Sequence, residues 1–389
     1  MSDVLLSQHL AVSVDPELPT ALISAQHLRA LHALTSRLPA GICEFFGFES
    51  RLGDVRAEVD FLLCAKASEG GREVLAGVTP GQALPSEFLD HPVWKQIRTF
   101  AANWVQPASP LHDCIQNTWL EFDISEDIGV ALCESTKTPP VPSLFIGTNT
   151  LFGRCGFAAP PWLLNQALPL CMGKAVAPDL AASLHAAIGA LPAHANIFQI
   201  GMMLGRPGGA NMLRLCITGM NRPEAIRYLQ AVQWPGEPEA IQDLLNFVYA
   251  GSDNVDLDID LQPQVGHKIG LECSFGADRD TPTRLAAFLE HLVQKGLCLD
   301  SKRHALLAWP RGFHERTNPS VWPAELRARS ANASTPTASM FMRWVYHVKI
   351  VYVPGQPLEA KAYLAVRQAW ITPEFIRQAK KAAAHPSPD

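Results

Sequence analysis

NVDLDIDLQPQVGHKIGLECSFG, residues 254–276, alternates apolar and polar side chains on either side of a central turn. Successive residues of a β-strand point to opposite faces, so the apolar residues share one face and Asp256, Asp258 and Asp260 share the other. The second half repeats this pattern, with Lys268 and Glu272 on its polar face. The stretch predicts an antiparallel hairpin whose polar face either meets bulk water, as in half-solvated sheets, or borders an enclosed space.

Four other stretches of the chain predict hairpins in the same way. They are residues 41–50 with 55–66, 117–125 with 141–149, 196–205 with 211–220, and 341–353 with 359–370. The Gly-rich GRPGGAN at 205–211 joins two strands and lacks the phosphate-loop pattern, so it predicts a turn. Five hairpins therefore alternate with other structure along the chain.

The segments between the hairpins change to a helical period. Apolar residues recur three and four positions apart in 24–38, 86–104, 179–191, 222–234, 239–250, 281–297 and 372–384. Amphipathic helices and half-apolar strands bury each other's apolar sides. The pattern predicts an α/β fold of about five αββα repeats, with helices on one face of the sheet.

Ten such strands can close into an antiparallel barrel, which places the second face of every strand inside. The residues expected inside are mostly polar, among them Asp60, Glu121, Asp123, Gln199, Arg214, His347, Lys349, Lys361 and Tyr363. By the same parity Phe198, Tyr346 and Tyr352 are expected to face outward. The fold class is therefore a ten-stranded antiparallel barrel with external helices and a polar lumen. An alternative is two α+β domains that divide near 175–195.

The expected domain organisation is an N-terminal extension over 1–25 and one barrel domain over 26–383. Residues 309–339 are rich in Pro, Arg, Ser and Asn and predict a long loop, which could serve as a lid. With 48% hydrophobic residues the chain can bury a large core, so disorder is not expected.

The composition also excludes several classes of partner and site. The net charge of -5 and the lack of a basic run argue against nucleic acid, and no apolar window approaches the roughly 18 residues of a membrane span. The N-terminus is a poor signal peptide, so a cytoplasmic location is expected. The nine cysteines form no C-x-x-C pair, which favours reduced thiols, and no histidine motif predicts a metal site.

The order of αββα units resembles the ABBA-type aromatic prenyltransferases, over residues of about 26 to 383. The resemblance is one of architecture, without a diagnostic sequence motif. It implies transfer of an isoprenyl group from an allylic diphosphate to an aromatic or peptide acceptor inside the barrel. It also implies no cofactor, and the D-D-x-x-D metal motif of other prenyl enzymes is missing here, as in this family.

The resemblance assigns roles to residues that parity places in the lumen. Arg214, Lys268, Lys349 and Lys361 are suited to the diphosphate, since a leaving diphosphate needs fixed cations. Tyr363 could shield the carbocation with its ring. Glu121, beside Trp119, could hold the aromatic acceptor by its donor proton.

The many acidic residues of the expected lumen leave a second function open. Asp258, Glu272 and their neighbours would repel a diphosphate, and the chain has only five tyrosines. The alternative is a non-catalytic barrel that binds a peptide or a small cationic ligand through its acidic strands. These charges could also be plain cross-strand ion pairs.

Overall fold

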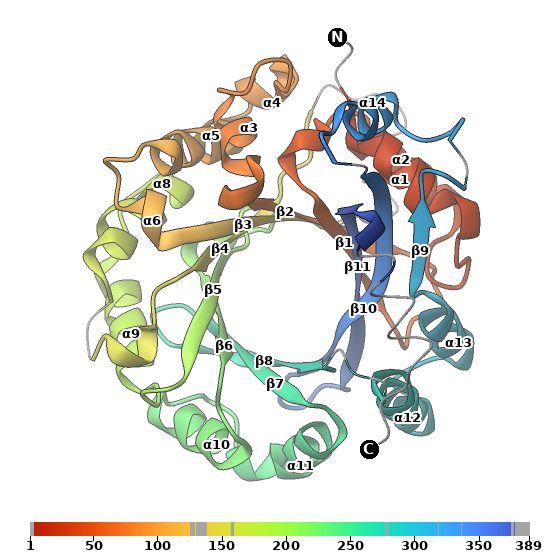
Figure 1. Ribbon diagram of the computed structural model, residues 1–389. Helices are drawn as coiled ribbons and strands as arrows, with labels where there is room; N and C mark the ends of the chain where they lie inside the picture. Colours follow the sequence, from red (N-terminus) through yellow and green to blue (C-terminus); the bar gives the residue numbers. More distant parts are fainter. Residues whose placement is uncertain are drawn as a thin grey trace.

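Ten antiparallel strands close into a barrel in the computed structural model of the protein (Figure 1). The structure describes residues 4–377 with gaps at 125–128, 130–137, 157–158, 277, 279, 318, 336 and 375–376. Neighbouring strands pair in the order β11-β1-β2-β3-β4-β5-β6-β7-β8-β10, and β10 pairs with β11 to complete the circle. An eleventh strand, β9, pairs with β10 outside this circle.

The ten barrel strands form five hairpins, as the sequence predicts. Their bounds are β1 (Phe45–Arg51), β2 (Val59–Lys66), β3 (Ile115–Phe122), β4 (Ser143–Thr148), β5 (Asn196–Met202), β6 (Leu213–Thr218), β7 (Asn254–Leu261), β8 (Val265–Ser274), β10 (Ala338–Tyr352) and β11 (Glu359–Ile371). The two-domain alternative is wrong, because β4 and β5 lie on either side of the expected division and pair from Leu144↔Met202 to Gly147↔Gln199.

The helices form a ring around the outside of the barrel (Figure 1). They are α1 (Leu6–Ser13), α2 (Ala25–Thr35), α3 (Gly71–Ala76), α4 (Ser86–Asp90), α5 (Pro92–Val105), α6 (Leu111–Cys114), α8 (Leu168–Met172), α9 (Pro178–Gly189), α10 (Arg222–Ala231), α11 (Gln242–Gly251), α12 (Thr281–Gln294), α13 (Asp300–Ala308) and α14 (Ala324–Asn332). The helix predicted over 372–384 falls mostly on residues outside the described part.

The main hydrophobic core lies between the outer sheet face and this ring of helices. Leu257 and Ile259 of β7 are almost fully buried there, as are Phe46 and Phe48 of β1. On the helix side, α5 buries Trp94, Ile97, Phe100, Ala101 and Trp104 along one stripe. The apolar faces of the hairpins therefore pack against the helices. The polar faces line the lumen and do not face bulk water.

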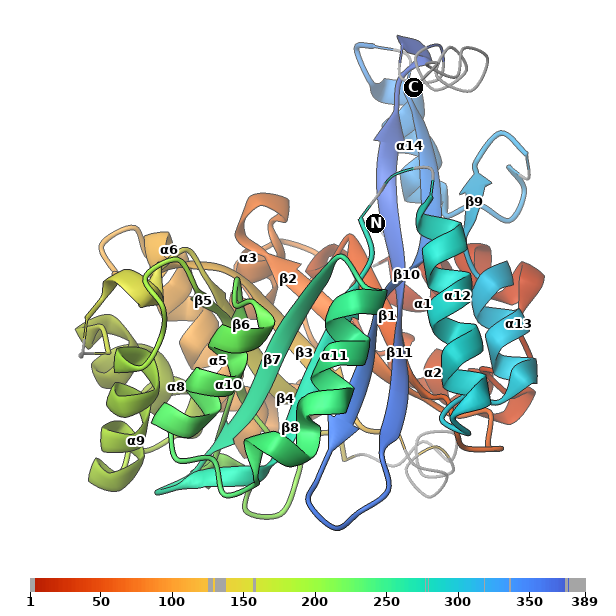
Figure 2. The same ribbon diagram turned by 90° about the horizontal axis from the view of Figure 1, so that it is seen from below.

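The loop predicted over 309–339 is wrong, because this segment contains β9 (Arg311–His314) and α14. β9 pairs with the first part of β10, with Phe313 opposite Phe341. α14 buries only Leu326 and therefore has no apolar stripe for a sequence pattern to reveal. Figure 2 shows α14 beside the part of the β10–β11 hairpin that projects beyond the other strands.

A buried arginine ties the N-terminal segment to this hairpin. Arg343 of β10 is 4% exposed and donates hydrogen bonds to the backbone carbonyls of Trp309, Ser13 and Glu17, at 3.2, 3.3 and 3.4 Å. Its guanidinium also lies 4.3 Å from the centre of the Trp309 ring. Three segments far apart in the sequence therefore meet at one side chain.

Replacing Arg343 with Met is expected to lower the free energy of unfolding by about 2–4 kcal/mol, because three backbone carbonyls, two of them in buried hydrogen bonds, lose their donor. Urea denaturation would measure the change. Arg327→Met at an exposed position of α14 is the matched control and should alter stability by less than about 0.5 kcal/mol. An unchanged midpoint for Arg343→Met would mean that desolvation of the guanidinium cancels its hydrogen bonds.

Candidate active site in the barrel lumen

Two connected cavities occupy the inside of the barrel. The outer cavity, about 390 Å³, is lined by Phe45, Cys64, Lys66, Gln116, Asn117, Trp119, Thr148, Phe198, Gln199, Trp344, Tyr346 and Arg367. The inner cavity, about 60 Å³, is lined by Leu62, Trp119, Glu121, Phe145, Phe198, Gln199, Arg214, Cys216, Glu272, Tyr346, His347, Lys349 and Tyr363. Trp119, Phe198, Gln199 and Tyr346 belong to both, so the aromatic outer cavity leads into a narrower, charged one.

Aromatic rings form much of the wall between the two cavities. Phe45 packs edge-on against Trp119 at 5.0 Å between ring centres, stacks on Trp344 at 5.5 Å, and meets Tyr346 at 5.7 Å. Phe145 also fits in the lumen, because a Cβ at Gly201 would lie 2.3 Å from its ring. The lumen thus presents several π faces, which attract cations.

Two β-bulges supply part of this aromatic wall, and they correct two sequence predictions. The register of β5 shifts between Ile197 and Gln199, and that of β10 shifts between Val345 and His347. Each bulge inserts a residue, Phe198 or Tyr346, that faces the lumen although simple parity sends it outward. Tyr352 follows parity and lies near Trp234 on the outer side, at 6.0 Å.

Glu121 reaches the inner cavity from β3 without a protein partner. Among the described residues no hydrogen bond or ion pair links its carboxyl group to another side chain. Burial and the nearby Glu49 raise the pKa of Glu121 to about 8, against the opposing effect of Lys349 and Arg214. Glu121 is therefore mostly protonated at neutral pH and available to a bound molecule.

His347 lies on the opposite wall with an unused ring nitrogen. Its side chain is almost fully buried, and its Nε2 has no hydrogen-bond partner in the described structure. The ring lies 4.2 Å from that of Tyr363, and Nε2 is 3.7 Å from Glu272 Oε1. Burial and the adjacent Lys349 lower the pKa of His347 to about 3, so the imidazole is neutral.

Lys349 forms the centre of a buried ion-pair cluster. Its Nζ contacts the carboxylate of Asp258 and lies 3.1 Å from Glu272 Oε1. A glycine makes this possible, because a Cβ at Gly270 would lie 2.6 Å from Lys349 Cε and 3.0 Å from the Asp258 carboxylate. Burial and Glu272 raise the pKa of Asp258, although Lys349 opposes the rise.

The other predicted cations are also paired with carboxylates. Arg214 donates to both oxygens of Asp260 at 2.7 and 3.0 Å. Lys361 lies 2.7 Å from Glu49, whose second oxygen accepts the Tyr363 hydroxyl proton in a hydrogen bond. These contacts lower the pKa of Glu49 even though burial opposes its ionisation.

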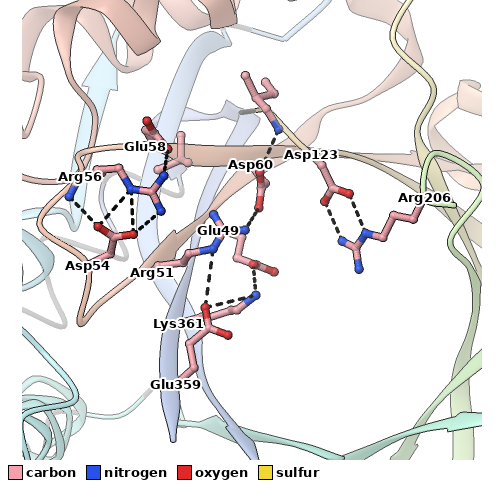
Figure 3. A network of polar contacts seen from close by, with 12 residues as sticks. Glu49, Arg51, Asp54, Arg56, Glu58, Asp60, Asp123, Arg206, Glu359 and Lys361 are labelled. Atoms are coloured by element: carbon pink, nitrogen blue, oxygen red, sulfur yellow. Dashed lines mark hydrogen bonds and ion pairs between the residues drawn. The ribbon is translucent and has the colours of Figure 1, made fainter. Parts of the chain in front are cut away.

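This pairing continues around the end of the lumen. Figure 3 shows Arg51, Glu359, Lys361 and Glu49 together on one side, with Asp123 and Arg206 facing them across the lumen. Arg51 lies 3.1 Å from Asp60, and Arg206 holds both oxygens of Asp123 at 2.6 Å. The cations of this end are therefore neutralised in the structure.

Lys268 differs from these cations. It is half-buried on β8, and in the described part of the chain no carboxylate lies within ion-pair distance of it. Burial, together with Arg214 and Lys361, lowers the pKa of Lys268 to about 8. A bound anion would favour the charged form of Lys268. The anion could pair with this lysine without displacing a carboxylate of the protein.

The structure brings most of the sequence-predicted site residues to one cavity. Trp119, Glu121, Arg214, Glu272, Lys349 and Tyr363 line it. Asp258 and Lys361 reach it through their partners Lys349 and Glu49. The sequence analysis missed Phe45, Phe145 and Trp344, because it searched the inner face for polar residues. Trp344 also has the parity of Tyr346, and it lies on the lumen side because of the bulge in β10.

The described residues also bear on metal binding, membrane spanning and disulfide formation. They contain no group of three or more His, Cys, Asp or Glu side chains placed to hold a metal ion. None of their helices is both long and apolar enough to cross a bilayer. The eight described cysteines are free thiols, and Cys133 lies outside the described part.

Comparison with known proteins identifies the architecture. No protein-family model matches the sequence, and no curated protein matches it. The crystal structure of the apo form of the prenyltransferase PriB aligns with a TM-score of 0.50 and 12% identity, covering 93% of this chain and 96% of PriB. The chain has the fold of an ABBA-type prenyltransferase. The 5-dimethylallyltryptophan synthase of Streptomyces coelicolor aligns at a TM-score of 0.41 and 13% identity, over 92% of this chain and 94% of that one.

The ABBA-like lumen combines three chemical capacities. Aromatic faces can stabilise a cation, the unpartnered Glu121 can exchange a proton or accept a hydrogen bond, and the lysines and arginines can bind an anion. The strands hold these groups around one narrow space, where the low dielectric strengthens each interaction.

The pKa of Glu121 leads to a prediction about stability. Because the folded value is above the unfolded one, the native state retains a proton that the unfolded chain loses, so this group makes stability fall as pH rises from about 4.5 to 8. Glu121→Gln removes the dependence. Its unfolding midpoint relative to the wild type should rise between pH 5 and pH 8.

Urea titrations at both pH values test this expectation. Glu290→Gln on α12, a partly exposed carboxyl that contacts Arg303 and Gln294 at the surface, is the control and should follow the wild type. If Glu121→Gln and the wild type keep a constant difference across this range, Glu121 titrates as an ordinary exposed carboxyl.

Proposed function

We propose that this protein transfers an isoprenyl group from an allylic diphosphate to an aromatic acceptor in the barrel lumen. One observation supports the proposal above the others: aromatic rings, the unpartnered Glu121 and the cations Arg214 and Lys349 line the same cavity. The ABBA-type fold places that cavity inside a closed barrel. An allylic cation needs π faces and little bulk water, which this lumen provides.

In the proposed reaction the C–O bond of the donor breaks, and the diphosphate leaves with the electron pair. Lys268, Lys349, Arg214 and Lys361 are the groups we assign to its negative charge. The allylic carbon then bonds to a carbon of the acceptor ring, which becomes a cation. We assign the stabilisation of both cations to the rings of Trp119, Tyr346 and Tyr363, which line the cavity.

Two side chains are assigned to the acceptor and its protons. Glu121 accepts a hydrogen bond from the donor N–H or O–H of the acceptor through its carbonyl oxygen and keeps its own proton. The neutral imidazole of His347 takes the proton that leaves the ring carbon, which restores the aromatic system. The resulting imidazolium would lie beside the carboxylate of Glu272, 3.7 Å away.

The experiment is a search for transfer. The protein is incubated with dimethylallyl or geranyl diphosphate and a pool of tryptophan, tyrosine, indole and indole-containing peptides, and products are examined by mass spectrometry. We expect a product heavier by one isoprenyl unit, and a higher melting temperature with the diphosphate alone. The absence of both results would reject the proposal.

A second candidate function follows from the charge pairing. Because Lys349, Lys361 and Arg214 already hold carboxylates, the lumen also suits a cationic ligand, such as a basic peptide, held by aromatic faces and by Asp258 and Glu272. Such a protein would be a binding barrel without catalysis. Its ligand would compete with the internal cations for the same carboxylates.

Substitution of an unpaired lysine separates the two functions. Lys268→Met removes a cation without leaving a carboxylate unpaired, so under the transferase proposal it should weaken binding of dimethylallyl diphosphate by about tenfold or more. Under the binding-barrel proposal it should leave a basic peptide bound as well or better. Isothermal titration of both ligands gives the answer.

Two further variants complete this test. Glu121→Gln should keep donor affinity and reduce turnover of the acceptor, whereas Lys95→Met on the exposed side of α5 should change neither. Asp258→Asn should weaken a basic peptide only if the barrel is an acidic binder. Equal donor affinity for Lys268→Met and the wild type would remove Lys268 from the site.

A further inference from the structure

The protein's own carboxylates pair with three of the four cations assigned to the diphosphate, namely Arg214, Lys349 and Lys361. Lys349 Nζ contacts Asp258 and lies 3.1 Å from Glu272. The side chains of Lys349 and Asp258 are 7% and 3% exposed, so water does not screen this cluster. An internal carboxylate therefore takes the position beside Lys349 that an incoming anion would need.

A diphosphate cannot simply be added to such a cluster. It brings two or three further negative charges into a lumen where carboxylates already pair with Arg214, Lys349 and Lys361, and buried like charges repel strongly. Lys349 would have to exchange Asp258 for a diphosphate oxygen. Asp258 would then be a buried carboxylate with no cation, which is costly unless it is neutralised.

We infer that Asp258 and Glu272 are internal counter-anions of the donor site, and that diphosphate displaces Asp258 from Lys349 with net uptake of protons by the barrel. This inference rests on the proposed function. Beyond that function, the inference states that binding of the diphosphate is linked to proton uptake by carboxyl groups of the lumen. Asp258 accordingly sets donor affinity without belonging to the reacting groups.

Protons can compensate the charge because several lumen carboxyls are already close to protonation. Burial raises the pKa of Asp258, that of Asp60 to about 6 and that of Glu121 to about 8. Loss of Lys349 as a partner would raise the pKa of Asp258 further, since Lys349 now opposes the rise. A proton is therefore the nearest available counter-charge.

The groups around Asp258 leave few other ways to absorb this charge. Arg214 and Cys216 face it from β6, Glu272 from β8, and His347 and Lys349 from β10. Arg214 is held by both oxygens of Asp260, and burial already keeps the Cys216 thiol protonated by raising its pKa. Asp258 is the carboxyl of this set whose raised pKa lets it gain a proton.

Isothermal titration of dimethylallyl diphosphate into the protein tests the coupling. Titrations at pH 7.5 in buffers of different ionisation enthalpy give the number of protons exchanged. We expect uptake of about 0.5–1 proton per ligand, and a dissociation constant that rises by up to about tenfold per pH unit above neutrality. Each titration is run with Mg²⁺ and with a chelator.

Two matched variants locate the protons. Asp258→Asn removes one of the two carboxylates paired with Lys349, so this variant should bind the diphosphate about tenfold more tightly and take up fewer protons. Asp179→Asn makes the same chemical change at an exposed position of α9 and should match the wild type in both respects. Because the ligand is identical in all three titrations, protons taken by the diphosphate itself cancel in the comparison.

The outcomes separate this inference from the proposed function. If the wild type binds the diphosphate without proton uptake, or if Asp258→Asn binds it more weakly, the inference is wrong while the proposed function stands. If the chelator abolishes binding, a metal ion supplies the compensating charge and the inference is also wrong. If the diphosphate binds to none of the proteins at any pH, the proposed function fails and takes the inference with it.

Discussion

The structure depends on one constraint, the two-residue period of its strands. Each strand gives one face to the helices and one to the lumen, and barrel closure turns the second face into an interior that water reaches only through its ends. The outer face is a conventional core of packed Leu, Ile and Phe side chains. The inner face can therefore carry charges and free polar groups without weakening that core.

Much of the fold follows from this period, and the sequence was sufficient to predict it. The five hairpins, the external helices and the inward position of Asp258, Lys349 and Tyr363 all come from alternation alone. The segment around α14 was missed for a physical reason. α14 buries Leu326 alone, and its other contacts come from polar side chains such as Arg329 over the Trp370 ring, so the helix leaves no periodic apolar pattern in the sequence.

The site was predicted less completely than the fold. Parity located Glu121 and the cations, but it could not show that Lys349 and Arg214 are paired with acids or that Lys268 is not, because register between distant strands decides this. It also misplaced Tyr346 and Phe198, since each sits in a bulge that only the pairing of neighbouring strands reveals. A local sequence pattern predicts which face of the sheet a residue lies on. Its interaction partners can be identified only from the strand pairing of the closed barrel.

The bulge at Tyr346 has a consequence for how such a barrel can change over evolutionary time. Val345 and Val348 both pack in the outer core, and the two residues between them, Tyr346 and His347, both line the lumen. A single-codon insertion or deletion in a wall strand can thus add or remove one interior group, at little cost to the helices outside. Substrate range can diversify by length changes within strands as well as by substitution.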